Sequence, residues 1–184
     1  MGQIIESAPT LEALLNQLVA PTRYVGSVSL IAAAAGDYAA GDVMSNSVTD
    51  TLGLPLYIAG LARTKGGVVN IQAIRAVCSE DAVLVTLRLH FFTLLPTPAE
   101  VEMDDNIAFT VKTVAGGLKW VGSLLLSPFV DRGTAVSTSD TVYSPIEPMH
   151  CDVNDTGLWF LPVLETAEAN ETANMDIRFD FYAL

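Results

Sequence analysis

The sequence predicts an all-β protein, an antiparallel β-sandwich of the jelly-roll-like kind, with a short N-terminal helical arm. Beyond residue 21 the chain reads as a series of segments with strand character, separated by turn signals such as "AAGD", "TKGG", "TVAGG", "DRG" and "NDTG". We find no helical periodicity between these segments, which favours antiparallel sheets packed as a sandwich or barrel. The chain, at 184 residues, is long for an immunoglobulin-like sandwich and lacks its Cys and Trp spacing, so a jelly roll is preferred.

The N-terminal arm, residues 1–21, contains one amphipathic stretch, "PTLEALLNQLV" at 9–19. Four leucines share one face of a helix at spacings i, i+3, i+4 and i+7, namely Leu11, Leu14, Leu15 and Leu18. Thr10 is a suitable N-cap and Pro21 ends the segment. A helix of about 10 residues is marginal alone in water, so the leucine face must pack on its own domain or on a neighbouring subunit.

The β domain, residues 22–184, contains ten expected strands. They are residues 23–31, 42–48, 54–62, 68–78, 82–93, 108–114, 119–126, 134–143, 158–165 and 173–182. The last is the clearest, because Met175, Ile177, Phe179 and Phe181 alternate with polar residues, as in a strand with one buried face. Residues 143–157 have two prolines and a turn cluster, which predicts a long surface loop.

The composition of the chain disfavours nucleic-acid and membrane partners. Acidic residues outnumber basic ones 21 to 9, for a formal charge of −12, so a nucleic-acid backbone would be repelled. No apolar run approaches the roughly 18 residues of a membrane span, and the first residues do not resemble a signal peptide. The high hydrophobic content, 51%, instead predicts burial against other subunits. Cys78 and Cys151 are expected to be reduced, partly buried thiols.

The stretch "VLVTLRLHFFTLLP" at 83–96 contains Arg88 and His90, a candidate catalytic or ligand-binding pair. Strand periodicity puts them on one face, about 7 Å apart, while Leu87, Leu89 and Phe91 share the other. The pair could grip an anion, but a polar stripe on the less buried face or at a subunit contact is the preferred interpretation. If that face is buried between subunits, we expect the partner of the pair to be a carboxylate of this acidic chain or of a neighbouring subunit.

No residue is assigned a catalytic, cofactor-binding or metal-binding role, and no cofactor is expected. Two histidines cannot build a multi-histidine cupin site, and "HCDVND" at 150–155 lacks the spacing of a zinc site. As a calcium loop, "DVNDTG" places Val163 where a bidentate Glu is needed, so an Asx-type turn is preferred. Trp120 and Trp159 could stack on sugars, although core packing is the commoner use of Trp in a strand.

Four phrases, taken together, carry a family resemblance: "YAAGDVMSNSV" at 38–48, "LARTKGGVVNIQAIRAVCS" at 61–79, "LRLHFFTLLPTPAEVEMDDNIAFTV" at 87–111 and "VGSLLLSP" at 121–128. They resemble small virion accessory proteins of tailed bacteriophages, of the type that decorates or cements the capsid. The resemblance implies a β-sandwich or jelly roll, a homo-oligomer that is often a trimer, and no enzymatic activity. It also implies binding to the major capsid protein on the capsid exterior, after synthesis in the host cytoplasm.

These observations leave two hypotheses for function. The first is a capsid decoration or cement protein that bridges major capsid subunits, with the leucine face of the arm, Arg88 and His90 as candidate interface residues. The alternative is a carbohydrate-binding β-sandwich module of a phage fibre or host-recognition structure, with Trp120 or Trp159 as the stacking platform. A hydrolase or isomerase is the weakest option, because it needs a pairing of His with an acid that the sequence does not display.

Overall fold

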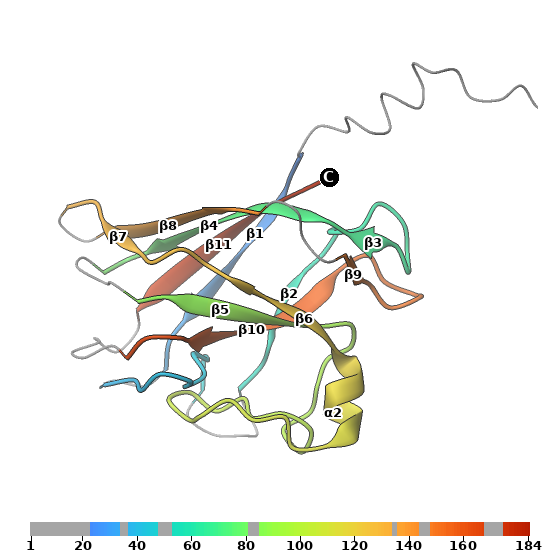
Figure 1. Ribbon diagram of the computed structural model, residues 1–184, viewed down its shortest axis with the longest axis horizontal. Coiled ribbons are helices and arrows are strands. Elements are labelled where there is room, and N and C mark those ends of the chain that lie inside the picture. Colours follow the sequence, from blue (N-terminus) through green and yellow to red (C-terminus); the bar gives the residue numbers. More distant parts are fainter. Residues whose placement is uncertain are drawn as a thin grey trace, which may run out of the picture.

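A computed structural model describes residues 23–33, 37–47, 53–80, 85–133, 136–143, 148–167 and 175–184, and this part of the chain is built from antiparallel β-strands (Figure 1). The all-β prediction is therefore confirmed. A five-stranded sheet has the order β1 (Arg23–Ile31), β11 (Asp176–Ala183), β4 (Ile71–Cys78), β8 (Ser137–Val142) and β7 (Val130–Asp131). A four-stranded sheet has the order β2 (Leu56–Ile58), β10 (Leu158–Leu164), β5 (Leu87–Phe92) and β6 (Trp120–Leu125). A small third sheet pairs β3 (Val68–Val69) with β9 (Met149–His150).

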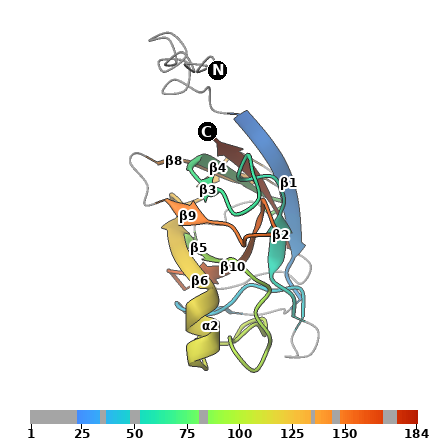
Figure 2. The same ribbon diagram turned by 90° about the vertical axis from the view of Figure 1, so that its right-hand side faces the viewer.

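The main hydrophobic core draws residues from both larger sheets, which are seen from two directions in Figures 1 and 2. On β11 the alternation works as expected, because Ile177, Phe179 and Phe181 are fully buried. Phe160 of β10 meets Phe181 of β11 with ring centroids 5.3 Å apart. The period-two pattern of each strand thus directs one face of each sheet into a shared core.

A second, smaller core lies around the opposite face of β10 and β5. Its buried members are Val43, Phe92, Val101, Met103, Leu161 and Val163, with Phe109 and Trp159 packed against them. Three of them, Val43, Val101 and Met103, belong to segments outside the regular strands. They cover part of the four-stranded sheet that simple alternation would leave in water.

Several expected strands differ from those in the structure. The predicted strand 23–31 coincides with β1, and 68–78, 119–126 and 158–165 contain β3 with β4, β6 and β10. The predictions for 42–48 and 108–114 are wrong, because residues 42, 43, 108 and 111 make only isolated bridges. The segment 54–62 shortens to β2, and the predicted loop at 143–157 contains β9. Parts of the expected strands at 82–93, 134–143 and 173–182 lie outside the described residues.

The expectation that no helix would separate the strands is also wrong. The structure has a short helix, α2 (Val114–Lys119), in the "TVAGG" stretch that the glycine pair marks as a turn. It lies at the end of the molecule opposite the C-terminus (Figure 2). Within the described residues, no helix has the length and apolar character needed to cross a membrane.

Candidate interaction surface

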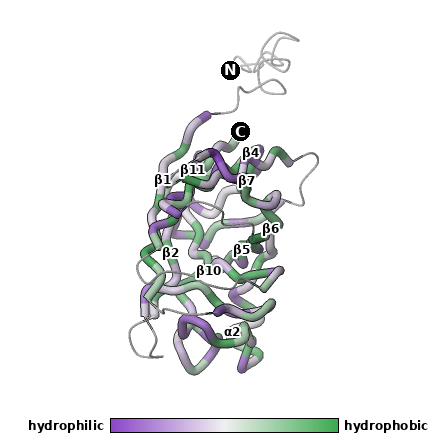
Figure 3. The backbone as a smooth tube through the Cα atoms, turned by 90° about the vertical axis from the view of Figure 1, so that its left-hand side faces the viewer, coloured by the Kyte–Doolittle hydropathy of each residue, from purple (hydrophilic) through white to green (hydrophobic). Residues whose placement is uncertain are grey.

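The connection between β5 and β6, with the first residue of β6, is called the α2 segment here and comprises residues 93–120. It carries seven of the sixteen large hydrophobic side chains that are exposed in the described part of the chain, namely Leu94, Leu95, Ile107, Val111, Val114, Leu118 and Trp120. Val114 and Leu118 are 81% and 80% exposed. Four residues apart on α2, they share one helix face. Figure 3 shows hydrophobic residues on α2 beside hydrophilic stretches of chain. A concentration of exposed apolar side chains is typical of a protein interaction site.

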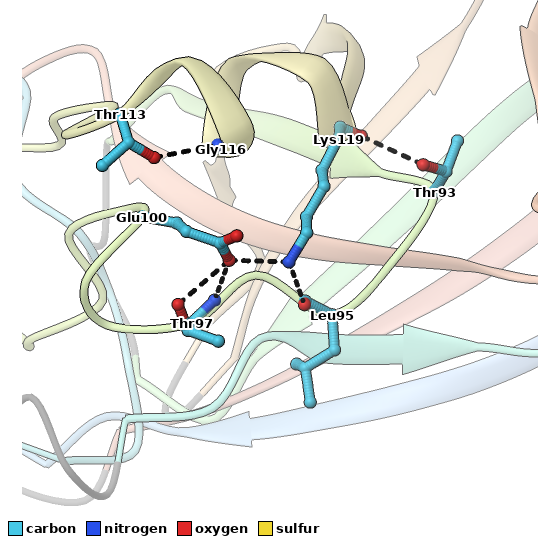
Figure 4. A network of polar contacts seen from close by, with 7 residues as sticks. All are labelled: Thr93, Leu95, Thr97, Glu100, Thr113, Gly116 and Lys119. Atoms are coloured by element: carbon cyan, nitrogen blue, oxygen red, sulfur yellow. Dashed lines mark hydrogen bonds and ion pairs between the residues drawn. The ribbon is translucent and has the colours of Figure 1, made fainter.

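A polar network fixes the position of α2 (Figure 4). The Lys119 ammonium donates to Glu100 Oε2 at 2.6 Å and to the Leu95 carbonyl at 3.1 Å. The same Glu100 oxygen accepts from the backbone N–H and the hydroxyl of Thr97, at 2.7 and 3.0 Å. The hydrogen bond from Lys119, followed by that from the Thr97 backbone, lowers the pKa of the Glu100 carboxyl. Lys119, at the end of α2, is thus bound to Leu95 and Glu100 in the first part of the α2 segment.

The sequence around α2 explains why a helix forms at an unpromising site. The Thr113 side chain caps the helix by accepting a hydrogen bond from the Gly116 N–H at 3.1 Å. Gly116 packs so closely that a Cβ atom there would lie 2.5 Å from the Glu100 carbonyl oxygen. The backbone N–H of Lys112, which directly precedes Thr113, donates to that same Glu100 oxygen at 2.7 Å. The glycine is therefore needed for the close approach, and not for a turn.

Arg88 and His90 lie on a common face of β5, as predicted. Leu87, Leu89 and Phe91 are fully buried on the other face, whereas Arg88 and His90 are half-buried. The Arg88 guanidinium forms an ion pair with Glu165, which directly follows β10. The expected carboxylate partner is thus present within the chain. Whether the pair also takes part in a subunit contact stays a prediction.

The His90 ring is covered by aromatic residues of the α2 segment. It stacks on Phe109 with centroids 4.2 Å apart, and Trp120 lies at 6.0 Å. Burial lowers the pKa of His90 from its ordinary 6.5 to about 4, and the positive charge of Arg88 acts in the same direction. The imidazole is therefore neutral near pH 7 and serves as an aromatic packing group.

The cluster around "HCDVND" is a turn, as the sequence predicted. Asp152 Oδ1 accepts from the Asn154 N–H at 2.9 Å, and Asp155 Oδ1 accepts from the Gly157 N–H at 3.1 Å. Across the described segments, no group of three or more His, Cys, Asp and Glu residues is placed to hold a metal ion. Cys78 and Cys151 are buried thiols that form no disulfide, and burial raises the pKa of the Cys151 thiol to about 11.

The remaining candidates are placed as follows. Trp120 is 43% exposed, whereas Trp159 is half-buried against Tyr57, with ring centroids 4.8 Å apart. Leu11, Leu14, Leu15 and Leu18 lie outside the described residues. The exposed surface of the α2 segment was not predicted, because no pattern in the sequence indicates that Val114 and Leu118 share a helix.

Comparisons with known proteins leave the geometry as the main guide to function. Neither the protein-family models nor the curated proteins that were compared with the chain gave a match.

Proposed function

We propose that the protein is a structural component of a phage virion, which decorates or cements the outer capsid surface by oligomerising and bridging major capsid protein subunits. The observation that carries this proposal is the exposed apolar surface of the α2 segment, fixed by the Lys119 and Glu100 ion pair. We assign the protein no enzymatic activity, and place it on the capsid exterior after synthesis in the host cytoplasm. The sequence resemblance to capsid decoration proteins points the same way.

The strand pairing supports a jelly-roll β-sandwich as the finer description of the fold. Eight strands pair like one long hairpin that has been folded over: β1 with β11, β2 with β10, β4 with β8 and β5 with β6. The chain also passes between the two larger sheets at almost every connection. Among these eight strands only β5 and β6 are consecutive neighbours in one sheet, and the short strand β7 adds to the edge of the other sheet beside β8. Viral capsid and lectin domains use this kind of architecture. Because a fold alone does not determine function, the surface must supply the rest.

A fixed apolar surface is well suited to binding another protein. Burial of apolar area stabilises a complex by roughly 25 cal/mol per Å². A surface that is already ordered loses little conformational entropy on binding, so more of that stabilisation appears as affinity. In a symmetric assembly each copy would present the same surface to an equivalent capsid site.

The charge also supports an exterior location. The formal charge of −12 would repel packaged DNA, whereas an outer surface imposes no such penalty. The resemblance adds the partners, which are other copies of the chain, most often in a trimer, and the major capsid protein, with neither nucleic acid nor membrane.

Binding to capsids assembled from the cognate major capsid protein tests the proposal directly. We expect Leu118→Asp to weaken binding by at least about tenfold, because a carboxylate would have to be desolvated at the interface. Val142→Asp is the matched control, since Val142 is equally exposed, at 81%, but lies on β8. Wild-type protein that does not bind capsids, or a Val142→Asp variant that binds as weakly as Leu118→Asp, would contradict the proposal.

The leucine face of the arm is the proposed contact between copies. Replacing Leu14 and Leu15 with Asp should reduce the mass of the oligomer in analytical ultracentrifugation while the free energy of unfolding of the β domain changes little. An oligomer of unchanged mass would remove the arm from the proposal.

The exposure of Trp120 favours a second candidate, the carbohydrate-binding module. A ring that is 43% exposed could stack on a sugar face. A glycan array probed with wild-type protein and with Trp120→Ala tests this candidate. Binding that the variant loses would support it, and an array with no binding would reject it.

A further inference from the structure

A hollow with basic lining lies where the start of β1 meets the turn after β2. It has a volume of about 520 Å³ and is lined by Arg23, Gly60, Ala62, Arg63 and Thr156. Its arginines come from separate parts of the chain, the first residue of β1 and the segment between β2 and β3. Two arginines thus line one concave surface in a protein with only nine lysine and arginine residues.

The guanidinium of Arg23 is held in place by the backbone. Its Nη2 donates to the Gly60 carbonyl at 2.7 Å and, more weakly, to the Leu61 carbonyl at 3.4 Å. A guanidinium has five N–H donors, so these bonds fix its orientation without using all of them. Arg63, by contrast, is exposed on the turn.

The two arginines differ from most cations of the chain. Arg75, Arg88, Lys112, Lys119 and Arg178 each form an ion pair with an Asp or Glu side chain. No ion pair joins Arg23 or Arg63 to another part of the chain that the structure describes. The carboxylate of the nearby Asp155 forms no ion pair with either arginine, and its Oδ1 accepts from the Tyr57 hydroxyl and from two backbone N–H groups.

Like charges that share a hollow repel each other and raise the free energy of the folded protein. An anion between them would lower it, and a guanidinium fork matches the oxygens of carboxylate and phosphate groups. Thr156 adds a hydroxyl-bearing residue to the lining. Acidic residues outnumber basic ones by 21 to 9 in the sequence, so two arginines that form no ion pair with a described carboxylate are unexpected.

We propose that the hollow between Arg23 and Arg63 is a binding site for an oxyanion, either a carboxylate presented by a protein surface or a free phosphate-like anion. The proposal stands independently of a role on the capsid. If the source is a protein, an acidic side chain of a second copy or of another subunit would enter the hollow.

Nuclear magnetic resonance titrations at constant ionic strength test the site. The probes are inorganic phosphate and, separately, a triglutamate peptide blocked at both ends. We expect saturable shifts at the amides of Gly60, Ala62, Arg63 and Thr156 with at least one probe. Arg63→Gln should weaken that binding by about tenfold, because it removes a charged donor. Arg75→Gln, which removes the same charge from an exposed ion pair with Asp140, should stay within about twofold of wild type.

The two titrations also identify the source of the anion. Binding of phosphate alone supports a free anion, and tighter binding of the peptide supports a carboxylate on a protein. Shifts that do not saturate with either probe, or equal affinity in wild type and Arg63→Gln, would overturn the proposal. Urea unfolding of Arg63→Gln, compared with wild type, verifies that the exposed substitution leaves the fold intact.

Discussion

The imidazole ring of His90 stacks on the phenyl ring of Phe109, with centroids 4.2 Å apart and planes inclined by 29°. This contact joins β5 to the α2 segment. The buried Nδ1 of His90 has no hydrogen-bond partner among the described residues, so no hydrogen bond from this atom stabilises the protonated ring. Burial and the neighbouring Arg88 both oppose protonation, while Glu165 favours it more weakly.

Folding stability should therefore fall between about pH 6.5 and pH 4. The pKa of His90 is about 4 in the folded protein against 6.5 ordinarily, so the unfolded chain binds the proton more readily. The stabilisation is complete above pH 6.5 and is lost as the pH falls through 4. The contribution of His90 to the free energy of unfolding is about 2 kcal/mol, because the ring is partly exposed and solvent screens part of the effect of the pKa difference. His90→Phe keeps the ring but cannot titrate, so its urea-unfolding free energy should fall less between pH 7 and pH 4.

Other groups also titrate in this range, so a control variant is needed. His150 is exposed on β9, and His150→Asn is the control for the removal of a histidine from the surface. If His90→Phe loses as much stability as wild type on acidification, then His90 does not cause the effect.

The two adjacent glycines of α2 should respond in opposite ways to alanine. A Cβ atom at Gly116 would lie 2.5 Å from the Glu100 carbonyl oxygen, so Gly116→Ala must displace backbone and should cost about 2 kcal/mol. At Gly117 the nearest atom is Val111 Cγ1 at 3.9 Å, an ordinary contact. Gly117→Ala should stabilise the protein by about 0.5 kcal/mol, because alanine favours the helix. Urea unfolding measures both, and equal effects would contradict the packing described for α2.

The same glycine pair shows why the interaction surface could not be predicted from sequence. Glycine disfavours helix, so "TVAGG" indicates a turn by local criteria. The contact that decides the outcome joins Gly116 to Glu100, which is brought close only by the folded connection. The exposure of Val114 and Leu118 then depends on the orientation of that helix, which the sequence alone does not show.

The strands were predictable where one face is buried and the other is wet. In β11, Ile177, Phe179 and Phe181 repeat with a period of two because they enter the main core. The expected strand at 42–48 failed because Val43 is apolar for another reason, as part of the second core beside β10. Shared placement of Arg88 and His90 followed from periodicity. The identity of Glu165 as partner required the pairing of Arg88 with Val163 across β5 and β10.

The bond between Tyr57 and Asp155 should stabilise the turn after β9. The Tyr57 hydroxyl donates to Asp155 Oδ1 at 2.5 Å, and burial together with this bond raises the pKa of Tyr57 to about 12. Tyr57→Phe should lower the free energy of unfolding by about 2 kcal/mol, because a hydrogen bond to a charged acceptor is lost. In a double-mutant cycle with Asp155→Asn the two losses should not add. Additive losses would mean that the two side chains act independently.

The ring of Phe160 provides the most direct test of the shared core. This fully buried residue of β10 meets Phe179 and Phe181 of β11, with centroids 5.6 and 5.3 Å apart, and so joins the two larger sheets. Phe160→Ala should cost about 3–5 kcal/mol, because it removes apolar contacts and leaves a cavity. The total free energy of unfolding of a single domain is only about 5–15 kcal/mol, so the variant should be close to unfolding at physiological temperature.

Val153→Ala is the control for Phe160→Ala, since Val153 is 76% exposed and its truncation should change stability by less than about 0.5 kcal/mol. Hydrogen exchange extends the test to cooperativity. Because the ring contacts both sheets, Phe160→Ala should accelerate exchange in β10 and β11 together. Loss of protection in β10 alone would mean that the two sheets are stabilised separately, since a core common to both cannot be weakened on one side only.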